Sequence, residues 1–455
     1  MSDEVAPVAK SSDPPKNRRL RILILVTSLG LIVWSAIEIV HLERAPARAL
    51  RLLRQQRPTE AETELFHYLR FHPRSPEAIL LWAQAVISGE VRTPREAATL
   101  AISRLQLIPE NSAQAGEARM REGRLTLLIL HQPALAESLL MRSIELNPNL
   151  LDSHYLLWQL FDMTERFQQS ETHFWKTYDL SDESARAERL REWYVSQFSP
   201  SASTAELDRQ MGFLKSGEFP GPESDIARLE EFYSSEPDSP LIVAALAQWY
   251  LRNYQRDEAL QILMRIRDRN VALQSPFYVA TSVAVLLEMG KLDEAKSNLE
   301  QWPKPTEGFV YWSTAGKVFD LVDRDDAAAV SAYDRALAVW PGPAEWSLMH
   351  RKAQCLARLG KKAEAEAVRN EARRVELQME ATAHQELRAA LANLDSPETS
   401  TQMIDFYESL NREQEASCWR DIRNRLSINV RLIYSNDASA PRPPVKFNDS
   451  TGLER

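Results

Sequence analysis

The chain has 455 residues, 44% hydrophobic and 26% charged, a balance close to that of an average soluble globular protein. This composition excludes a collagen-like, disulfide-stapled or wholly disordered chain. Only 13 residues are glycine. Nucleotide-binding α/β folds, propellers and barrels of this length use more glycine in tight turns and phosphate loops, so the composition favours an all-α protein.

The net charge of -9 is unevenly distributed along the chain. Residues 1–21 carry five Lys or Arg against three acids, and residues 41–57 carry five Arg against Glu43 alone. The rest of the chain, from residue 58 onward, is therefore acidic. Because phosphate neutralisation by Lys and Arg supplies most nucleic-acid affinity, an acidic body without a basic stripe predicts no nucleic-acid partner.

The first predicted element after the basic tail of residues 1–21 is an apolar segment from Ile22 to Val40, with Glu38 as its one ionisable side chain. A helix of this length spans about 28 Å, enough to cross a hydrocarbon core of roughly 30 Å. Lys16, Arg18 and Arg19 lie just before it. We therefore expect a single transmembrane helix that acts as an uncleaved signal anchor.

A cleaved signal peptide is the main alternative, because Ala45-Pro46-Ala47 resembles a small-residue cleavage site. The apolar segment is longer than an ordinary signal-peptide core of 7 to 15 residues, which favours the anchor. Basic residues flank both ends of the segment, so the charge rule gives no clear orientation. A short tail before a large domain favours a bacterial inner-membrane protein with its body exported, and a body facing the cytoplasm is the alternative.

From Arg44 onward, amphipathic helical patterns follow one another, and a small residue recurs with a fixed spacing. Ala61, Ala97, Ala136 and Ala329 are each followed twelve residues later by a proline. The intervals between successive anchors are 36, 39 and 34 residues in the first series, and 36, 34 and 36 in the second. The anchors are Ala61, Ala97, Ala136 and Ser170, then Ala259, Ala295, Ala329 and Ala365.

This spacing resembles that of the tetratricopeptide repeat family, whose unit is a helix-turn-helix of about 34 residues. The clearest copy runs from Met289-Gly290-Lys291 to Ala295, and a second from Ala329 to Trp340-Pro341. In the first of these, glycine suits the end of one helix, and the acids that follow suit the start of the next. The first three copies lack the glycine and tyrosine of the family's first helix, so the resemblance is thinner there.

The resemblance implies an all-α solenoid of such helix pairs, from about residue 45 to 375, closed by a C-terminal helical cap. The predicted organisation is a first array over 44–182, a degenerate repeat or joint over 183–222 and a second array over 223–375. Beyond these, the sequence predicts one long helix from Lys361 to Leu394 and further capping helices up to 434, followed by a disordered tail over 435–455. Residues Val445 to Leu453 resemble the lead-in to an FG-GAP/VCBS-type propeller, which leaves a truncated two-domain protein as an alternative.

No catalytic or metal-binding motif emerges from the sequence. The eight histidines are scattered, with no HExxH pair and no Cys/His spacing for zinc, and there is no GxSxG elbow or phosphate loop. We expect Cys355 and Cys418 to be free buried thiols, although a disulfide would form if their Cα atoms came within about 7 Å. The sequence thus predicts no enzyme activity, cofactor, metal or small-molecule substrate.

The resemblance also implies a concave groove lined by the first helix of each pair. The residues it would place there are apolar, aromatic or amide-bearing. They include Trp82, Tyr155, Gln159, Leu241, Gln248, Phe277, Ala280, Ala284, Tyr311, Thr314, Val318, His350 and Gln354. The Lys, Arg and Asn with which some family members clamp a C-terminal carboxylate are missing from this set.

The favoured function is a membrane-anchored scaffold or adaptor that binds a peptide or helix of another protein in this groove. The alternative is an assembly factor in envelope or membrane-complex biogenesis, in which the span docks to the complex and the repeats act as a spacer. Replacing residues Ile22 to Val40 with an unrelated spanning helix distinguishes the two functions.

Overall fold

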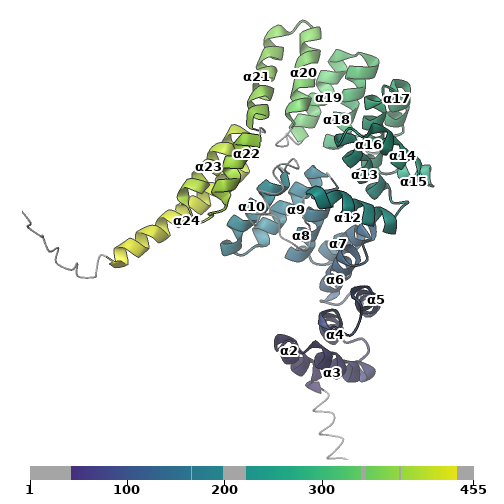
Figure 1. Ribbon diagram of the computed structural model, residues 1–455, viewed down its shortest axis with the longest axis vertical. Coiled ribbons are helices and arrows are strands. Elements are labelled where there is room, and N and C mark those ends of the chain that lie inside the picture. Colours follow the sequence, from purple (N-terminus) through teal and green to yellow (C-terminus); the bar gives the residue numbers. More distant parts are fainter. Residues whose placement is uncertain (1–42, 165, 198–221, 340–344, 379–380, 438–455) are drawn as a thin grey trace, which may run out of the picture. The chain divides into compact units, whose positions relative to one another are not determined.

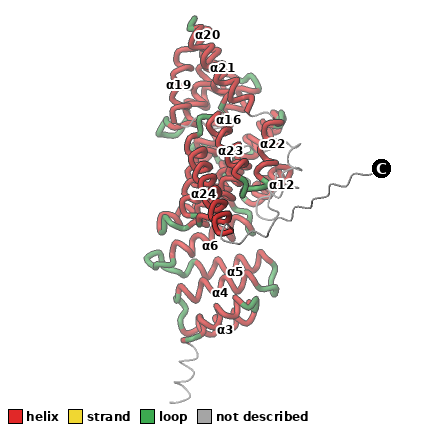
Figure 2. The backbone as a smooth tube through the Cα atoms, turned by 90° about the vertical axis from the view of Figure 1, so that its left-hand side faces the viewer, coloured by secondary structure: helices red, strands yellow, loops and turns green. Residues whose placement is uncertain are grey.

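The computed structural model describes residues 43–164, 166–197, 222–339, 345–378 and 381–437 (Figure 1). Over these ranges the chain consists of helices joined by turns and short loops, with no strand (Figure 2). Contacts divide the chain into two compact units, unit 1 up to Leu125 and unit 2 from Thr126. The all-α expectation is confirmed for this part of the chain.

Unit 1 begins with two antiparallel helix pairs, and a further helix crosses into unit 2. Proline occupies one of the first two positions of four of these helices, where its missing N–H costs nothing. Thr93 forms a capping box with Glu96, in which each side chain bonds the other residue's backbone N–H. The helices are α2 (Ala45–Arg54), α3 (Pro58–Phe71), α4 (Pro76–Ser88), α5 (Pro94–Leu105) and α6 (Ala115–Leu128).

Unit 2 continues with further helices of 9 to 17 residues, together with shorter turns and a longer last helix. The helices that precede the cavity described below are α7 (Pro133–Leu146), α8 (Leu151–Met163), α9 (Phe167–Leu180), η1 (Glu183–Ala185), α10 (Arg186–Gln197) and α12 (Pro222–Ser235). The next are α13 (Pro240–Arg252), α14 (Arg256–Met264), α15 (Arg269–Ala272), α16 (Pro276–Glu288), α17 (Leu292–Glu300), α18 (Gly308–Val318) and η2 (Phe319–Asp323). The last are α19 (Asp326–Val339), α20 (Trp346–Arg358), α21 (Lys362–Gln378), α22 (Ala381–Leu391), α23 (Pro397–Ser409) and α24 (Glu413–Asp437).

The repeat found in the sequence corresponds to pairs of packed helices, such as α4 with α5, α8 with α9, α16 with α17 and α20 with α21. All eight anchors are buried, and seven of them lie on the second helix of such a pair, whereas Ala136 lies on α7, which packs on α8. A small side chain at this position lets the two helix backbones approach closely. The tetratricopeptide-like architecture is thus built on the residues that the spacing predicts.

Glycine ends two of the first helices, as the best-preserved copies predict. Gly290 and Gly360 have φ of 71° and 79°, the left-handed conformation that closes a helix at low cost when no Cβ is present. In pairs that lack this glycine, other residues adopt the same conformation. They are Gln56, His131, Tyr254 and Arg324.

One first helix departs from regular geometry at its end. α18 continues into η2, a π-helical turn over Phe319–Asp323, which holds one more residue than an α-turn. Directly before it, Gly316 faces Tyr333 on α19 so closely that an added Cβ would lie 2.5 Å from the ring. The glycine therefore lets α18 and α19 pack in contact.

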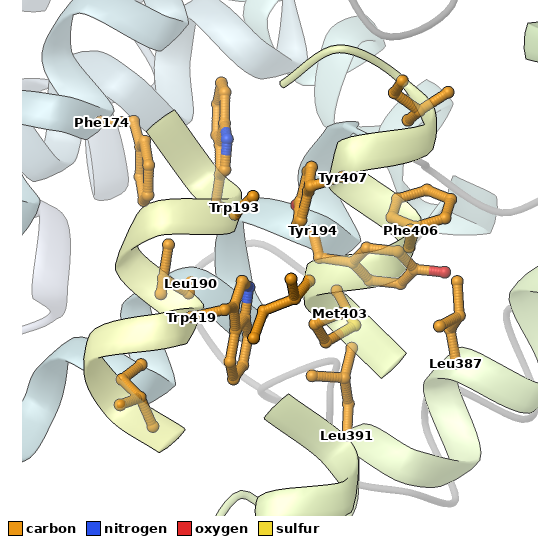
Figure 3. Close-up of a cluster of buried hydrophobic side chains, with 14 of the residues drawn as sticks. Phe174, Leu190, Trp193, Tyr194, Leu387, Leu391, Met403, Phe406, Tyr407 and Trp419 are labelled. Carbon is orange, nitrogen blue, oxygen red and sulfur yellow. The ribbon is translucent and has the colours of Figure 1, made fainter. Parts of the chain in front are cut away.

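A large aromatic core joins two segments that are far apart in the sequence (Figure 3). Phe174 stacks on Trp193 with ring centroids 4.3 Å apart, and both lie in a cluster with Tyr407 and Trp419 from α23 and α24. The carboxylate of Glu415 accepts a hydrogen bond from Trp193 Nε1 at 3.3 Å and an ion pair from Arg412, which also binds Glu171 on α9. The helices α22–α24 therefore pack on α8–α10.

The predicted helix from Lys361 to Leu394 covers α21 and α22, and residues 379–380 between them lie outside the described residues. α21 pairs with α20 as part of the array, whereas α22 belongs to the aromatic core through the hydrogen bond between Tyr194 Oη and His384 Nδ1, 2.6 Å long. Cys355 and Cys418 are both free thiols.

Several expectations concern residues outside the described ranges. They are the basic tail, the span from Ile22 to Val40, most of the joint, and the tail with its propeller-like lead-in. A search of the helices that are described finds none that is both apolar enough and long enough to cross a bilayer.

Candidate partner-binding cavity

Unit 2 contains a cavity of about 830 Å³, within the size range of ordinary ligand pockets. We call it the unit-2 cavity. Its main walls are the first helices of three successive pairs, α13, α16 and α18, and the beginning of α20 closes one side. Side chains from α7 and α9 form part of its rim. The cavity therefore lies where the resemblance places a groove.

The sequence of α16 opens the space. Ala280 and Ala284, one turn apart, both line the cavity, and their small side chains leave room that a leucine would fill. Phe277, half-buried on the same helix, adds an aromatic wall. Gln248 of α13 accepts a hydrogen bond of 3.3 Å from Thr281, which fixes the amide at the junction of α13 and α16.

Two ionisable groups from neighbouring helices face this largely apolar space. Lys317 on α18 and Glu345 at the start of α20 both line the cavity, and no hydrogen bond or ion pair joins either side chain to another described residue. Burial lowers the pKa of Lys317 and raises the pKa of Glu345, and each charge partly opposes the shift of the other. Ser239 Oγ, at the N-terminus of α13, is also buried without a partner in the described part of the chain.

The rim is polar and its charges are balanced. Arg166 binds Glu137 with two hydrogen bonds of 2.9 and 2.8 Å, so this cation is already neutralised. Across the whole lining, three cationic and three acidic side chains occur together, and none of the lining residues is a histidine, cysteine or aspartate. The cavity thus combines a largely apolar lining with a balanced set of charged groups.

The structure brings six of the predicted groove residues into the cavity: Leu241, Gln248, Phe277, Ala280, Ala284 and Thr314. On α18 the lining residues are Gly308, Phe309, Val310, Ser313, Thr314 and Lys317, whereas the prediction placed Tyr311, Thr314 and Val318 there. The predicted register is shifted by one residue because the π-helical turn after α18 adds one residue between this helix and Ala329. Counting from the repeat anchor across that turn therefore selects the neighbouring face of the helix.

Four other predicted residues, on α18 and α20, lie outside the cavity. Tyr311 packs edge-on against Trp302, with centroids 5.2 Å apart, and Val318 is buried in the core of the same helices. His350 lies 3.2 Å from the carboxylate of Glu376, and Gln354 is exposed on α20. None of these four side chains lines the cavity.

The predicted residues that precede α13 also lie elsewhere. Trp82 is buried within unit 1, with the guanidinium of Arg104 5.6 Å from its ring. Tyr155 borders the aromatic core of unit 2, edge-on to Trp158, and Gln159 is half-buried on the same helix α8. The groove prediction for these residues followed the repeat pattern, and the structure instead shows contacts within their own units.

A separate cluster of Asp320, Asp326 and Cys355 brings potential metal ligands within 4.8 Å of one another. The guanidinium of Arg358 lies among them, because it donates to Asp326 at 2.6 and 2.8 Å, to Asp320, and to Cys355 Sγ at 3.2 Å. Burial and the Asp320 charge raise the pKa of Cys355 to about 12, which keeps the thiol protonated. The arrangement links η2, α19 and α20 through an ion-pair network around the buried Asp320, with Arg358 partly exposed.

The fold and the cavity define an all-helical protein of tetratricopeptide-like repeats with a binding-type cavity on the first helices of its second array. No protein-family model matches the sequence. No curated protein matches it either.

Solved structures with similar helical arrangements include PilF of Pseudomonas aeruginosa, at 16% identity over 50% of this chain and 93% of that chain, with a TM-score of 0.24. A tetratricopeptide repeat protein of Parabacteroides merdae is similar at 11% identity over 70% of this chain and 99% of that chain, with a TM-score of 0.27. Human IFIT1, solved as a dimer with PPP-AAAA, is similar at 13% identity over 83% of this chain and 89% of that chain, with a TM-score of 0.29.

Proposed function

We propose that the protein is a non-enzymatic, membrane-anchored scaffold whose unit-2 cavity binds an apolar segment of a partner protein. The observation that carries the proposal is the cavity itself, formed by successive first helices and lined by Phe277 and the small residues of α16. Buried apolar anchors in a helical groove are a common mode of peptide recognition.

The ionisable groups of the cavity favour a segment that also carries polar groups. Leaving Lys317 and Glu345 without direct partners in an apolar cavity is unfavourable, and a bound backbone or side chain can hydrogen-bond to them. With equal numbers of cations and acids in the lining, the cavity does not attract a phosphate backbone. We therefore propose a protein partner and no nucleic acid.

The membrane anchor in this proposal is the apolar segment from Ile22 to Val40, which has the length and flanking charges of a spanning helix. We place the protein in a bacterial inner membrane, with the repeats exported. The scaffold would then hold its partner beside the membrane.

The proposal is tested by site-specific photocrosslinking of the full chain in membranes. A photoreactive residue at Ser313, inside the cavity, should capture a defined partner, whereas one at the exposed Gln354 should not. A second variant, Ala280→Leu with Ala284→Leu, fills the cavity and should abolish capture from Ser313. The alanine variants of Tyr155 and Tyr311 are less informative, because both tyrosines support packing.

Two outcomes would contradict the proposal. One is capture of the same proteins from positions 313 and 354, and the other is unchanged capture after the cavity is filled. Circular dichroism of the filled variant provides the folding control, because both alanines face open space and leucine should fit without unfolding α16. Capture of RNA from position 313 would instead assign the cavity to nucleic acid.

A further inference from the structure

The surface at the start of unit 1 is unusual in an otherwise acidic protein. From Glu43 to Arg74 the chain has seven arginines and four glutamates. All four glutamates have cationic partners or histidine contacts: Glu60 with Arg57, Glu62 with Arg92, Glu64 with Arg48, and Glu43 with His72. The remaining five arginines have no acidic partner among the described residues: Arg44, Arg51, Arg54, Arg70 and Arg74.

These unpaired arginines are exposed and lie on two adjacent helices. Arg44, Arg51 and Arg54 follow the exposed side of α2, since positions seven and ten residues apart fall on neighbouring parts of a helix surface. Arg70 lies at the end of α3 and Arg74 just beyond it, both exposed. α2 and α3 pack together as a pair, and the contact of 3.4 Å between Glu43 and His72 brings the start of α2 to the end of α3.

Two phenylalanines are exposed in the last two turns of α3. Phe66 precedes Arg70 by one turn and is 56% exposed, while Phe71 is 67% exposed. A single exposed aromatic residue needs no explanation, but two of them beside unpaired arginines form a surface that combines apolar rings with positive charge. We call Arg44, Arg70, Arg74, Phe66 and Phe71 the basic aromatic face.

This face lies close, along the chain, to the predicted membrane span. Glu43 is only three residues beyond Val40, which limits the separation to about 11 Å even for a fully extended chain. His72 is in turn tied to Glu43, so the end of α3 is held at the same point. Arginines beside a membrane attract anionic headgroups, and exposed aromatic rings favour the headgroup region.

We infer that the basic aromatic face is a membrane-surface site, which binds anionic phospholipid headgroups through its arginines and inserts Phe71 at the boundary of the acyl chains. The inference rests on the proposed anchoring, which puts the bilayer next to Glu43. It assigns the first repeat pair a second contact with lipid, and this contact restrains the scaffold against the membrane surface.

The test uses the full chain reconstituted in vesicles of phosphatidylcholine, with or without phosphatidylserine. An environment-sensitive fluorescent residue replaces Phe71, or, as a matched control, Val91 between α4 and α5, which is 70% exposed. With phosphatidylserine present, the probe at position 71 should shift its emission to the blue and be quenched by nitroxide-labelled lipid. The probe at position 91 should show neither effect.

The arginines are tested in the same assay. The triple variant Arg44→Gln, Arg70→Gln and Arg74→Gln should lower the lipid-bound fraction at position 71 about a hundredfold, at roughly fivefold for each arginine. High salt should have a similar effect. Because these side chains are exposed and unpaired within the described residues, the variant should keep its helical circular dichroism.

The inference would be overturned by equal quenching at positions 71 and 91. It would also be overturned if quenching at position 71 did not depend on phosphatidylserine, or if it were unchanged in the triple variant. A blue shift that appears only with an added acidic polypeptide would assign the face to a protein partner. Extraction in alkaline carbonate separates this result from the anchor. Resistance to carbonate without quenching keeps the anchor and rejects the face, whereas extraction with quenching at neutral pH rejects the anchor and keeps the face.

Discussion

Helix ends in this protein show how single residues are held in a costly conformation by their surroundings. Tyr254, after α13, has a φ of 61°, which is favourable for glycine and unfavourable for a residue with a Cβ. Its side chain is 87% exposed and contributes little packing. The corresponding position after α16 is Gly290.

Tyr254→Gly should therefore stabilise the protein by about 1 kcal/mol, because the strain of the left-handed conformation is removed. Urea denaturation measures the change as a higher midpoint with an unchanged slope. Leu359→Gly, at a residue with ordinary helical angles, is the control and should destabilise by a similar amount. A lower midpoint for Tyr254→Gly would contradict the strain argument.

The buried histidines give the protein a predictable dependence on pH. His173 shares a hydrogen bond of 2.9 Å with His154, and burial, followed by repulsion from His154, lowers the pKa of His173 to about 4. Beside Tyr194 of the aromatic core, burial lowers the pKa of His384 to about 4 as well. Between pH 6.5 and about 4 the unfolded chain thus binds more protons than the folded chain at both histidines.

We expect stability to be constant above about pH 7 and to fall as the pH drops from 6.5 towards 4, by about 3 kcal/mol for each of these two histidines. His384→Gln should reduce this pH dependence, even if it lowers stability at neutral pH. His67→Gln, at an exposed site, should leave the dependence unchanged. The urea midpoints of the variants and the parent protein are measured at pH 7.5 and at pH 5. An equal change of midpoint between the two pH values for His384→Gln and the parent protein would refute the argument.

At the scale of elements, the packing of α22–α24 on α8–α10 depends on a few large aromatic side chains. Trp193 of α10 is buried, stacks on Phe174 and donates a hydrogen bond to Glu415 of α24 (Figure 3). Its removal would leave a cavity between two groups of helices and would remove one of the hydrogen bonds to Glu415, which keeps its ion pair with Arg412. Both effects are destabilising.

Trp193→Ala should destabilise unit 2 by about 3 to 5 kcal/mol and increase hydrogen exchange in α23 and α24 more than in α16. Trp249→Ala, at a half-buried site on α13, is the control and should have a smaller effect without the selective exchange in α24. An equal increase of hydrogen exchange in α16 and α24 of the Trp193 variant would show that the aromatic core does not specifically stabilise the packing of α24.

The elements themselves could be predicted from local patterns, and the finer geometry could not. The recurring small residues placed eight of the helices, because close helix packing requires a small side chain at the contact. The cavity-facing residues of α18 were predicted one residue out of register. The reason is that no local sequence pattern predicts the π-helical turn at Phe319–Asp323. Lys317 was missed for the same reason.

The contact between α10 and α24 also could not be predicted from the periodicity of the sequence. Amphipathic spacing shows that a helix has an apolar face but not which helix covers it. The residues that meet here, such as Trp193 and Glu415, are 222 positions apart. The aromatic content of both segments was visible in the sequence, although nothing in it paired them.

For the whole molecule, the decisive prediction follows from the proposed membrane anchor and concerns the side of the membrane on which the repeats would then lie. If the body is exported, protease added to intact spheroplasts should remove it, while a cytoplasmic marker protein survives. Arginines after the span oppose those before it, so this result depends on the size of the translocated domain and not on local charge. Protection in spheroplasts with digestion in inverted vesicles would place the body in the cytoplasm.

The long separation between the partners of the aromatic core has a consequence for biosynthesis. A ribosome that adds about 5 to 20 residues per second needs roughly 10 to 45 seconds to reach Glu415 after it has made Trp193. During that interval, α8–α10 emerge with their aromatic faces uncovered and open to aggregation. The nascent chain should therefore bind a chaperone during this interval. An mRNA truncated before the codons of α22 should yield an insoluble product.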